Sequence, residues 1–156
     1  MFQIPMRFYL ILAVCLLPLS GCGGKALPEG MPKLTPTILT VTLDGAPLED
    51  AIVGLIPLDS ANGRWNAGGV TDKSGKAKIR TLAEYDGVVP GKYKVTVTKT
   101  YVEPLPEGMT YQESLKFKRP PDVEYVHKDY ATQSKTPLEL EVGSSAVNET
   151  FEVEKP

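Results

Sequence analysis

Residues 91–99, GKYKVTVTK, constrain the fold more than any other stretch of the chain, because apolar and polar residues alternate along them. In an extended strand successive side chains point to opposite faces, so Tyr93, Val95 and Val97 share one face and Lys94 lies on the other. A helix would scatter both sets around its axis. This stretch therefore predicts a β-strand with one buried face and one solvated face.

The same alternation of apolar and polar residues returns in several other short stretches. They are Thr37–Leu43, Ala51–Ile56, Lys76–Arg80, Leu138–Val142 and Thr150–Glu154, with turn signals at Asp44-Gly45 and Asp72–Gly75. The 14 prolines and 14 glycines fall mainly between these stretches, as expected for strands joined by turns. We therefore expect an all-β, immunoglobulin-like (transthyretin-like) β-sandwich of about seven strands over residues 37–156. The last two stretches are expected to be its closing strands.

Residues 100–135 interrupt this pattern with several prolines and little regular alternation. Loops of this length inside compact domains are uncommon and are usually functional or disordered. We expect a long loop that carries one helical turn over Gln112–Lys116.

The N-terminus carries an uninterrupted apolar run of about twelve residues from Phe8, preceded by a single charge at Arg7. Such a run is too short to span a hydrocarbon core of roughly 30 Å, but it suits the central region of a secretory signal. The alternative, a core helix, is disfavoured because Pro18 and the glycines around Cys22 would break it. We therefore predict an export signal.

The end of this run, Leu19-Ser20-Gly21-Cys22, resembles the lipobox of bacterial lipoproteins. The resemblance implies a signal peptide over residues 1–21 and acylation of Cys22, with palmitate among the acyl groups. It also implies a lipid-anchored membrane protein of the cell envelope. The residue after Cys22 is not Asp, which leaves the outer membrane open as a destination. Gly23 to Pro36 is rich in Gly and Pro, so residues 22–36 are predicted to form a flexible tether.

Cys15 and Cys22 are the two cysteines of the chain. If the lipobox is processed, Cys15 is removed and Cys22 is acylated, so no thiol is left for a disulfide, a metal or catalysis. The alternative is that the two cysteines form a disulfide or lie in a core.

Three pieces of the chain together resemble carboxypeptidase regulatory-like, transthyretin-like domains. They are Gly45–Pro57, identified with that family's first hairpin, Thr71–Ala77, its central turn, and Val89–Val97, its ascending strand. The resemblance covers about residues 39–99 well and residues 130–154 more loosely. It implies a sandwich that serves as an accessory, spacer or docking element, without zinc ligands of its own. A fold of this kind does not by itself define a reaction.

The sequence offers little for catalysis or for metal binding. The chain has 17 Lys and Arg against 19 Asp and Glu, scattered along its length, so we expect no nucleic-acid partner. His127 is the sole histidine and lacks a nucleophile motif, and it is interpreted as a solvated loop residue. Asp59 begins a turn without the remaining ligands of a calcium loop, and we expect an Asx-type turn there. We predict no catalytic residue, metal or cofactor, and a hydrolase is the weakest of three hypotheses.

The aromatic residues form the remaining candidate site, with Trp65, Tyr101 and Tyr111 as possible ligand or partner contacts. Trp65 stands among polar residues and glycines, which favours a surface position. The leading hypothesis is a non-enzymatic envelope protein that acts as a structural module or binds a protein partner. The second is a carbohydrate-binding module that uses Trp65 and the loop tyrosines. For the whole aromatic set, the favoured interpretation is instead that the side chains only fasten the long loop to the sandwich; the set comprises Trp65, Tyr101, Tyr111, Tyr125 and Tyr130.

Overall fold

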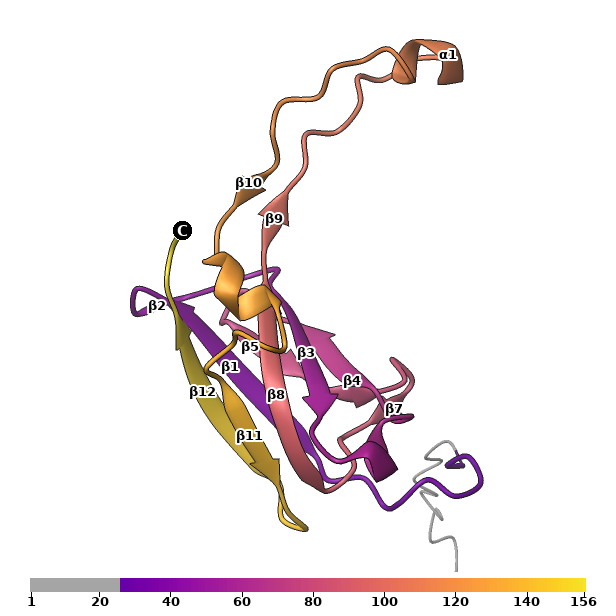
Figure 1. The fold of residues 1–156 in the computed structure, drawn as a ribbon, viewed down its shortest axis with the longest axis vertical. Coiled ribbons are helices and arrows are strands. Elements are labelled where there is room, and N and C mark those ends of the chain that lie inside the picture. Colours follow the sequence, from indigo (N-terminus) through magenta and orange to yellow (C-terminus); the bar gives the residue numbers. More distant parts are fainter. Residues whose placement is uncertain (1–25) are drawn as a thin grey trace, which may run out of the picture.

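The chain forms a β-sandwich in which two sheets pack over one main core (Figure 1), as a computed structural model that describes residues 26–156 shows. The predicted signal peptide and Cys22 lie outside the described residues. One sheet contains β1 (Thr37–Leu43), β2 (Ala46–Pro47), β5 (Lys76–Lys78) and β12 (Val147–Val153). The other has the order β11 (Glu139–Val142), β8 (Gly91–Thr98), β3 (Ile52–Pro57), β4 (Ala67–Val70), β6 (Arg80–Thr81) and β7 (Tyr85–Asp86).

The predicted alternation along β8 is confirmed, and it builds the centre of the core. Tyr93, Val95 and Val97 are fully buried, each 0% exposed. β8 lies between β3 and β11 and is antiparallel to both, with Val53 opposite Val97. One face of β8 lies on the core and the other faces outward, which explains why its apolar and polar residues alternate so regularly.

The two closing strands were predicted correctly, but they join different sheets. β11 pairs with β8 in the larger sheet, whereas β12 pairs in parallel with β1 in the smaller one. The inward residues of β12 are Phe151 and Val153, which complete the core against β1. The segment Gly45–Pro57 is not a hairpin, because β2 pairs with β1 while β3 pairs with β4 and β8. It crosses from one sheet to the other.

A smaller apolar cluster covers one end of the sandwich, and it shows that the tether is shorter than predicted. Met31, Trp65 and Val89 pack together there. Thr35 exchanges two backbone hydrogen bonds with Val88, at 2.8 and 2.9 Å. Residues 31–36 therefore belong to the folded sandwich, and the prediction that the whole of residues 22–36 is a flexible tether is wrong over this part. Met31 is the residue responsible, because its side chain gains burial by folding back.

Residues 99–125 leave the sandwich as a long hairpin, which we call the arm (Figure 1). Its base is the short ribbon of β9 (Thr100–Tyr101) and β10 (Val123–Glu124), and its tip carries α1 (Tyr111–Ser114). The helical turn predicted over Gln112–Lys116 thus forms slightly earlier. Thr110 and Glu113 cap it reciprocally, which explains where it begins. After the arm, the 3₁₀ helix η2 (Lys128–Ala131) brings the chain back onto β8.

The arm and the first folded residues lie at opposite ends of the sandwich. Val89, which packs in one cluster with Met31, lies two residues before β8, whereas the arm follows the last residue of β8, Thr98. A strand of eight residues is roughly 25 Å long at about 3.3 Å per residue. Figure 1 shows the same arrangement, with the arm extending beyond one end of the sheets and the earliest described residues at the other.

Candidate functional site

Trp65 is buried, so the prediction that it offers an exposed aromatic face is wrong. Its side chain is 7% exposed and packs against Met31 and Val89. The guanidinium of Arg64 covers the ring at 4.5 Å from its centroid and donates to the carbonyl of Gly30 at 3.4 Å. The polar residues on either side of Trp65 gave no sign of this, because the segment that covers the ring lies 34 residues away along the chain. A sugar ring therefore has no open indole face to stack on.

Tyr101 and Tyr111 are both exposed, at 48% and 77% of their surface, and both lie on the arm. Tyr125 stands at the base of the arm, where the ammonium group of Lys99 lies 5.2 Å from its ring centroid. Tyr130, in contrast, is buried against the core. Of the four tyrosines, Tyr130 fastens the returning chain to the sandwich, while Tyr101 and Tyr111 are free to meet a ligand or a partner.

The arm concentrates the exposed apolar surface of the molecule. Seven of the thirteen exposed large apolar residues among residues 26–156 lie on it: Tyr101, Val102, Leu105, Tyr111, Leu115, Val123 and Tyr125. The two legs of the arm carry Pro104, Pro106, Pro120 and Pro121, which favour an extended backbone. The arm has too few residues to bury these side chains against one another, so it presents them to the surroundings.

Charge is divided unevenly between the two legs of the arm. The outgoing leg, residues 100–110, carries Glu103 and Glu107 and no cation. The side chain of Glu103 hydrogen-bonds to the hydroxyl of Tyr101, and this contact, with the nearby negative charge, raises the pKa of Tyr101. The returning leg carries Lys116, Lys118 and Arg119, which form no ion pair within residues 26–156. The outgoing leg is therefore apolar and acidic.

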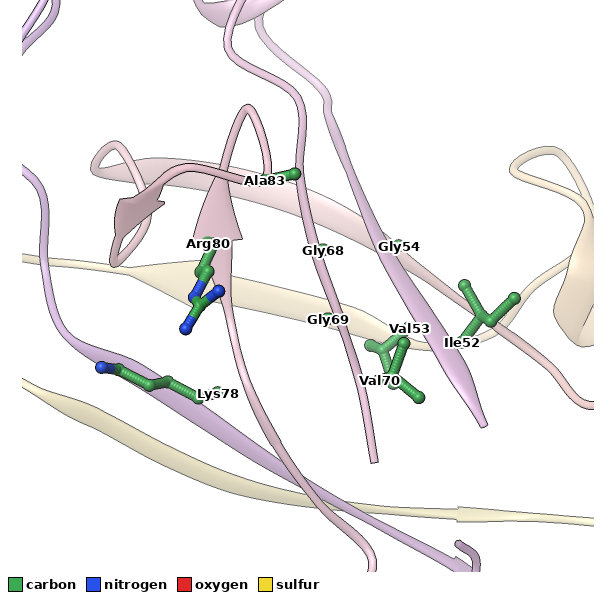
Figure 2. Close-up of a pocket in the computed structure, with 9 residues that line it drawn as sticks. All are labelled: Ile52, Val53, Gly54, Gly68, Gly69, Val70, Lys78, Arg80 and Ala83. Atoms are coloured by element: carbon green, nitrogen blue, oxygen red, sulfur yellow. The ribbon is translucent and has the colours of Figure 1, made fainter. Parts of the chain in front are cut away.

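A shallow hollow of about 680 Å³ lies on the outer side of β3, β4 and β6, and sequence reasoning did not find it. Figure 2 shows Gly54 and Gly68 on adjacent strands, with Ile52 and Val70 at one end. Ile52 and Val70 are about 60% exposed (60% and 58%) although both are apolar. The chain between Lys76 and Thr81 passes from one sheet to the other, and this crossing forms the opposite wall. We call this hollow the β4 groove.

Two cations line the wall of the β4 groove opposite Ile52 and Val70. Lys78 and Arg80 both bind the carboxylate of Asp86, with N to O distances of 2.5 and 3.1 Å. The hydrogen bond from Lys78 and the two positive charges lower the pKa of Asp86. Lys78 and Arg80 therefore share the carboxylate of Asp86 at this wall. The alternation in Lys76–Arg80 predicted solvated cations here, but the strands that face them were not predictable from local sequence.

The polar residues considered for chemistry have structural roles. Asp59 accepts a hydrogen bond from the amide of Ala61 at 2.9 Å and caps η1 (Ser60–Asn62), which confirms the predicted Asx-type turn. His127 caps η2, its Nδ1 accepting from the amide of Asp129 at 3.3 Å. Among residues 26–156, no three His, Cys, Asp or Glu side chains are grouped to hold a metal ion. Within the same residues, no helix has the length and apolar character to cross a bilayer.

Comparisons with known proteins identify no family for the chain: no protein-family model and no curated protein sequence matches it. Among solved structures it is similar to a variant of BcpA, the major pilin subunit of Bacillus cereus. The identity is 19% over 80% of this chain and 31% of the pilin chain, with a TM-score of 0.45. It is also similar to a 9R-lipoxygenase from Cyanothece, with 12% identity over 82% of this chain and 18% of the lipoxygenase, and a TM-score of 0.40. Both similarities are too distant to transfer a function.

Proposed function

We propose that this chain is a non-enzymatic, lipid-anchored protein of the cell envelope that binds a protein partner through its arm. The observation that carries the proposal is the arm itself, a proline-rich hairpin that holds seven large apolar residues outside the sandwich. A concentration of exposed large apolar residues on one segment is typical of a surface that a partner covers. Tyr101 and Tyr111 are the proposed contacts, because aromatic residues often dominate the binding free energy of an interface.

The position of the arm agrees with an anchor at Cys22. The chain enters the sandwich at Met31, and the arm leaves from the opposite end, after Thr98. A membrane attached through Cys22 would therefore lie toward the end of the sandwich remote from the arm. The sandwich then acts as a spacer that holds the arm away from the lipid surface, where it can reach a partner in the envelope.

We further propose that the sandwich is a carboxypeptidase regulatory-like, transthyretin-like domain. The three resembling pieces, Gly45–Pro57, Thr71–Ala77 and Val89–Val97, contribute neighbouring residues to one core, among them Leu55, Ala77 and Val95. The non-enzymatic part of the proposal rests on the sequence, which has no catalytic motif around His127 and no cysteine after Cys22.

The anchor is tested by replacing Cys22 with Ser, with Cys15→Ser as the matched control. In cells supplied with labelled palmitate, the unaltered protein and Cys15→Ser should be labelled and recovered with the membrane. Cys22→Ser should lose the label and remain as unprocessed precursor. A labelled, membrane-bound Cys22→Ser product would contradict the anchor.

The role of the arm is tested with a photo-crosslinking amino acid placed at Tyr111 or Tyr101 in living cells. The matched control is the same amino acid at Leu58, which is 50% exposed but lies off the arm. We expect products of defined mass from the two arm positions and none from Leu58. Products that are equally diffuse from all three positions would mean that the arm binds nothing specific. Tyr111→Ala should change the stability of the fold by less than about 0.5 kcal/mol, because the side chain is exposed.

A further inference from the structure

The β4 groove and the outgoing leg of the arm are complementary in chemistry, although they lie on different parts of the molecule. The groove joins an apolar end, at Ile52 and Val70, to a cationic wall, at Lys78 and Arg80. The leg joins exposed apolar residues to acids within residues 101–107, YVEPLPE, and has no cation. Each surface can supply apolar cover to the other, and the acids of the leg add negative charge at a wall where Lys78 and Arg80 share the carboxylate of Asp86.

The backbone of each surface also suits an extended occupant. Gly54 and Gly68 face each other across β3 and β4 and carry no side chains, although the hydroxyl of Thr96 on β8 lies against Gly54, so a bound segment can approach the backbone on the Gly68 side. The leg is held extended by Pro104 and Pro106, so less conformational entropy is lost when it binds. Glu107 forms no ion pair within residues 26–156, and it is available to a cation on another molecule.

We propose that the β4 groove of one copy of this chain binds the outgoing leg of the arm of a second copy. Val102 and Leu105 cover Ile52 and Val70, while Glu103 and Glu107 face the cationic wall. The arm begins beside Ile52 of its own chain, which pairs with Thr98, but it points away from the groove and extends beyond the end of β8 (Figure 1), so its outgoing leg is presented to another molecule. The contact is therefore heterologous, and repeated copies would form a row rather than a closed symmetric dimer.

A contact of this size is weak on its own. Stable interfaces bury about 1,200–2,000 Å² in total, and a leg of seven residues covers less than that. The inference rests on the proposed function in one respect: copies held on one membrane meet at a high effective concentration, which favours a weak contact. We therefore expect the association at the membrane and not in dilute detergent solution.

The test uses the full chain in its membrane, with a photo-crosslinking amino acid at Leu105. We expect a homodimer whose crosslink maps by mass spectrometry to the region of Ile52 and Val70. Reversing the wall with Lys78→Glu and Arg80→Glu should reduce the dimer at least about tenfold, because like charges then face one another. Glu103→Lys with Glu107→Lys should have the same effect. The chain that carries all four changes should recover the dimer.

Two controls separate the inference from unfolding. Trp65 fluorescence shows whether each variant keeps its fold, and the milder Lys78→Gln with Arg80→Gln should give an intermediate loss of dimer. The inference is overturned if no homodimer forms, if charge reversal leaves its yield unchanged, or if the fourfold variant is no better than either double variant. If Tyr111 then still crosslinks to a different protein of defined mass, the proposed function stands and only the partner assigned here is wrong.

Discussion

Replacing Thr71 with Val should destabilise the sandwich by about 3 kcal/mol, although the two side chains have almost the same shape. Thr71 is 2% exposed and lies directly after β4. Its hydroxyl donates to the carbonyl of Leu48 at 2.6 Å and accepts from the amide of Ala51 at 2.8 Å. These two bonds hold the crossing from β2 to β3 against the end of β4.

The expected loss of stability follows from the two buried backbone groups that lose their hydrogen-bond partner when Val replaces Thr71. Ala51 is 0% exposed and Leu48 is 5% exposed, so water cannot replace the lost hydroxyl without opening the structure. Leaving a buried donor or acceptor without a partner costs about 1–3 kcal/mol, and about 1.5 kcal/mol for each of the two groups gives about 3 kcal/mol. For a chain of this size that corresponds to a fall in Tm of about 10 °C.

The measurement is urea unfolding followed by the fluorescence of Trp65, which is the sole tryptophan and is buried in the folded state. Thr71→Ser is the informative comparison, because it keeps the hydroxyl and loses one buried methyl group, at a cost of about 1 kcal/mol. Thr150→Val, on an exposed position of β12, should change the stability by less than about 0.5 kcal/mol. If Thr71→Val proves less harmful than Thr71→Ser, packing and not hydrogen bonding holds this crossing, and the reasoning is refuted.

Two further predictions concern a strained turn and a buried tyrosine. Leu82 and Ala83 have positive φ values, 54° and 58°. Ala83→Gly should relieve about 1–2 kcal/mol of backbone strain and cost about 0.5–1 kcal/mol of backbone entropy. The substitution should therefore raise the urea concentration at the midpoint of unfolding. Tyr93 donates to the carbonyl of Val89 at 2.5 Å, and Tyr93→Phe should cost about 1–2 kcal/mol at neutral pH. Burial raises the pKa of Tyr93 to about 12 from 10.0, so its stabilising effect is complete below pH 10 and is lost as the pH rises to 12. Stability should therefore fall more steeply over that range in the unaltered protein than in Tyr93→Phe, and equal slopes would contradict this.

Much of the fold could be predicted from local sequence, because a strand with one buried face must alternate apolar and polar residues. The alternation in residues 91–99 identified the three residues at the centre of the core, and the one at Leu138–Val142 identified a closing strand. The turns at Asp44-Gly45 and at Asp72–Gly75 were also predictable, because Gly45 and Gly75 adopt positive φ, and the carboxylate of Asp72 accepts hydrogen bonds from the amides of Ser74 and Lys76.

The candidate site was predicted only in part. Tyr101 and Tyr111 are exposed on the segment that the proline-rich composition marked as unusual, and their role in binding stays a prediction. The prediction that Trp65 lies at the surface was wrong because its burial depends on Met31 and Val89, which are far away in the sequence. The polar residues next to Trp65 carry no information about those contacts. The β4 groove was missed for the same reason.

The strands, their inward faces and the turns follow from the amino-acid sequence, since each of them depends on interactions between residues close together along the chain. The sheet that each strand joins follows from the packing of the whole domain, in which β12 pairs in parallel with β1 while β11 pairs with β8. The tertiary structure also decided that Met31 covers Trp65, that the arm leaves from the end of the sandwich remote from Met31, and that Lys78 and Arg80 face a groove. These features depend on contacts between residues many positions apart, which only the packing of the two sheets specifies.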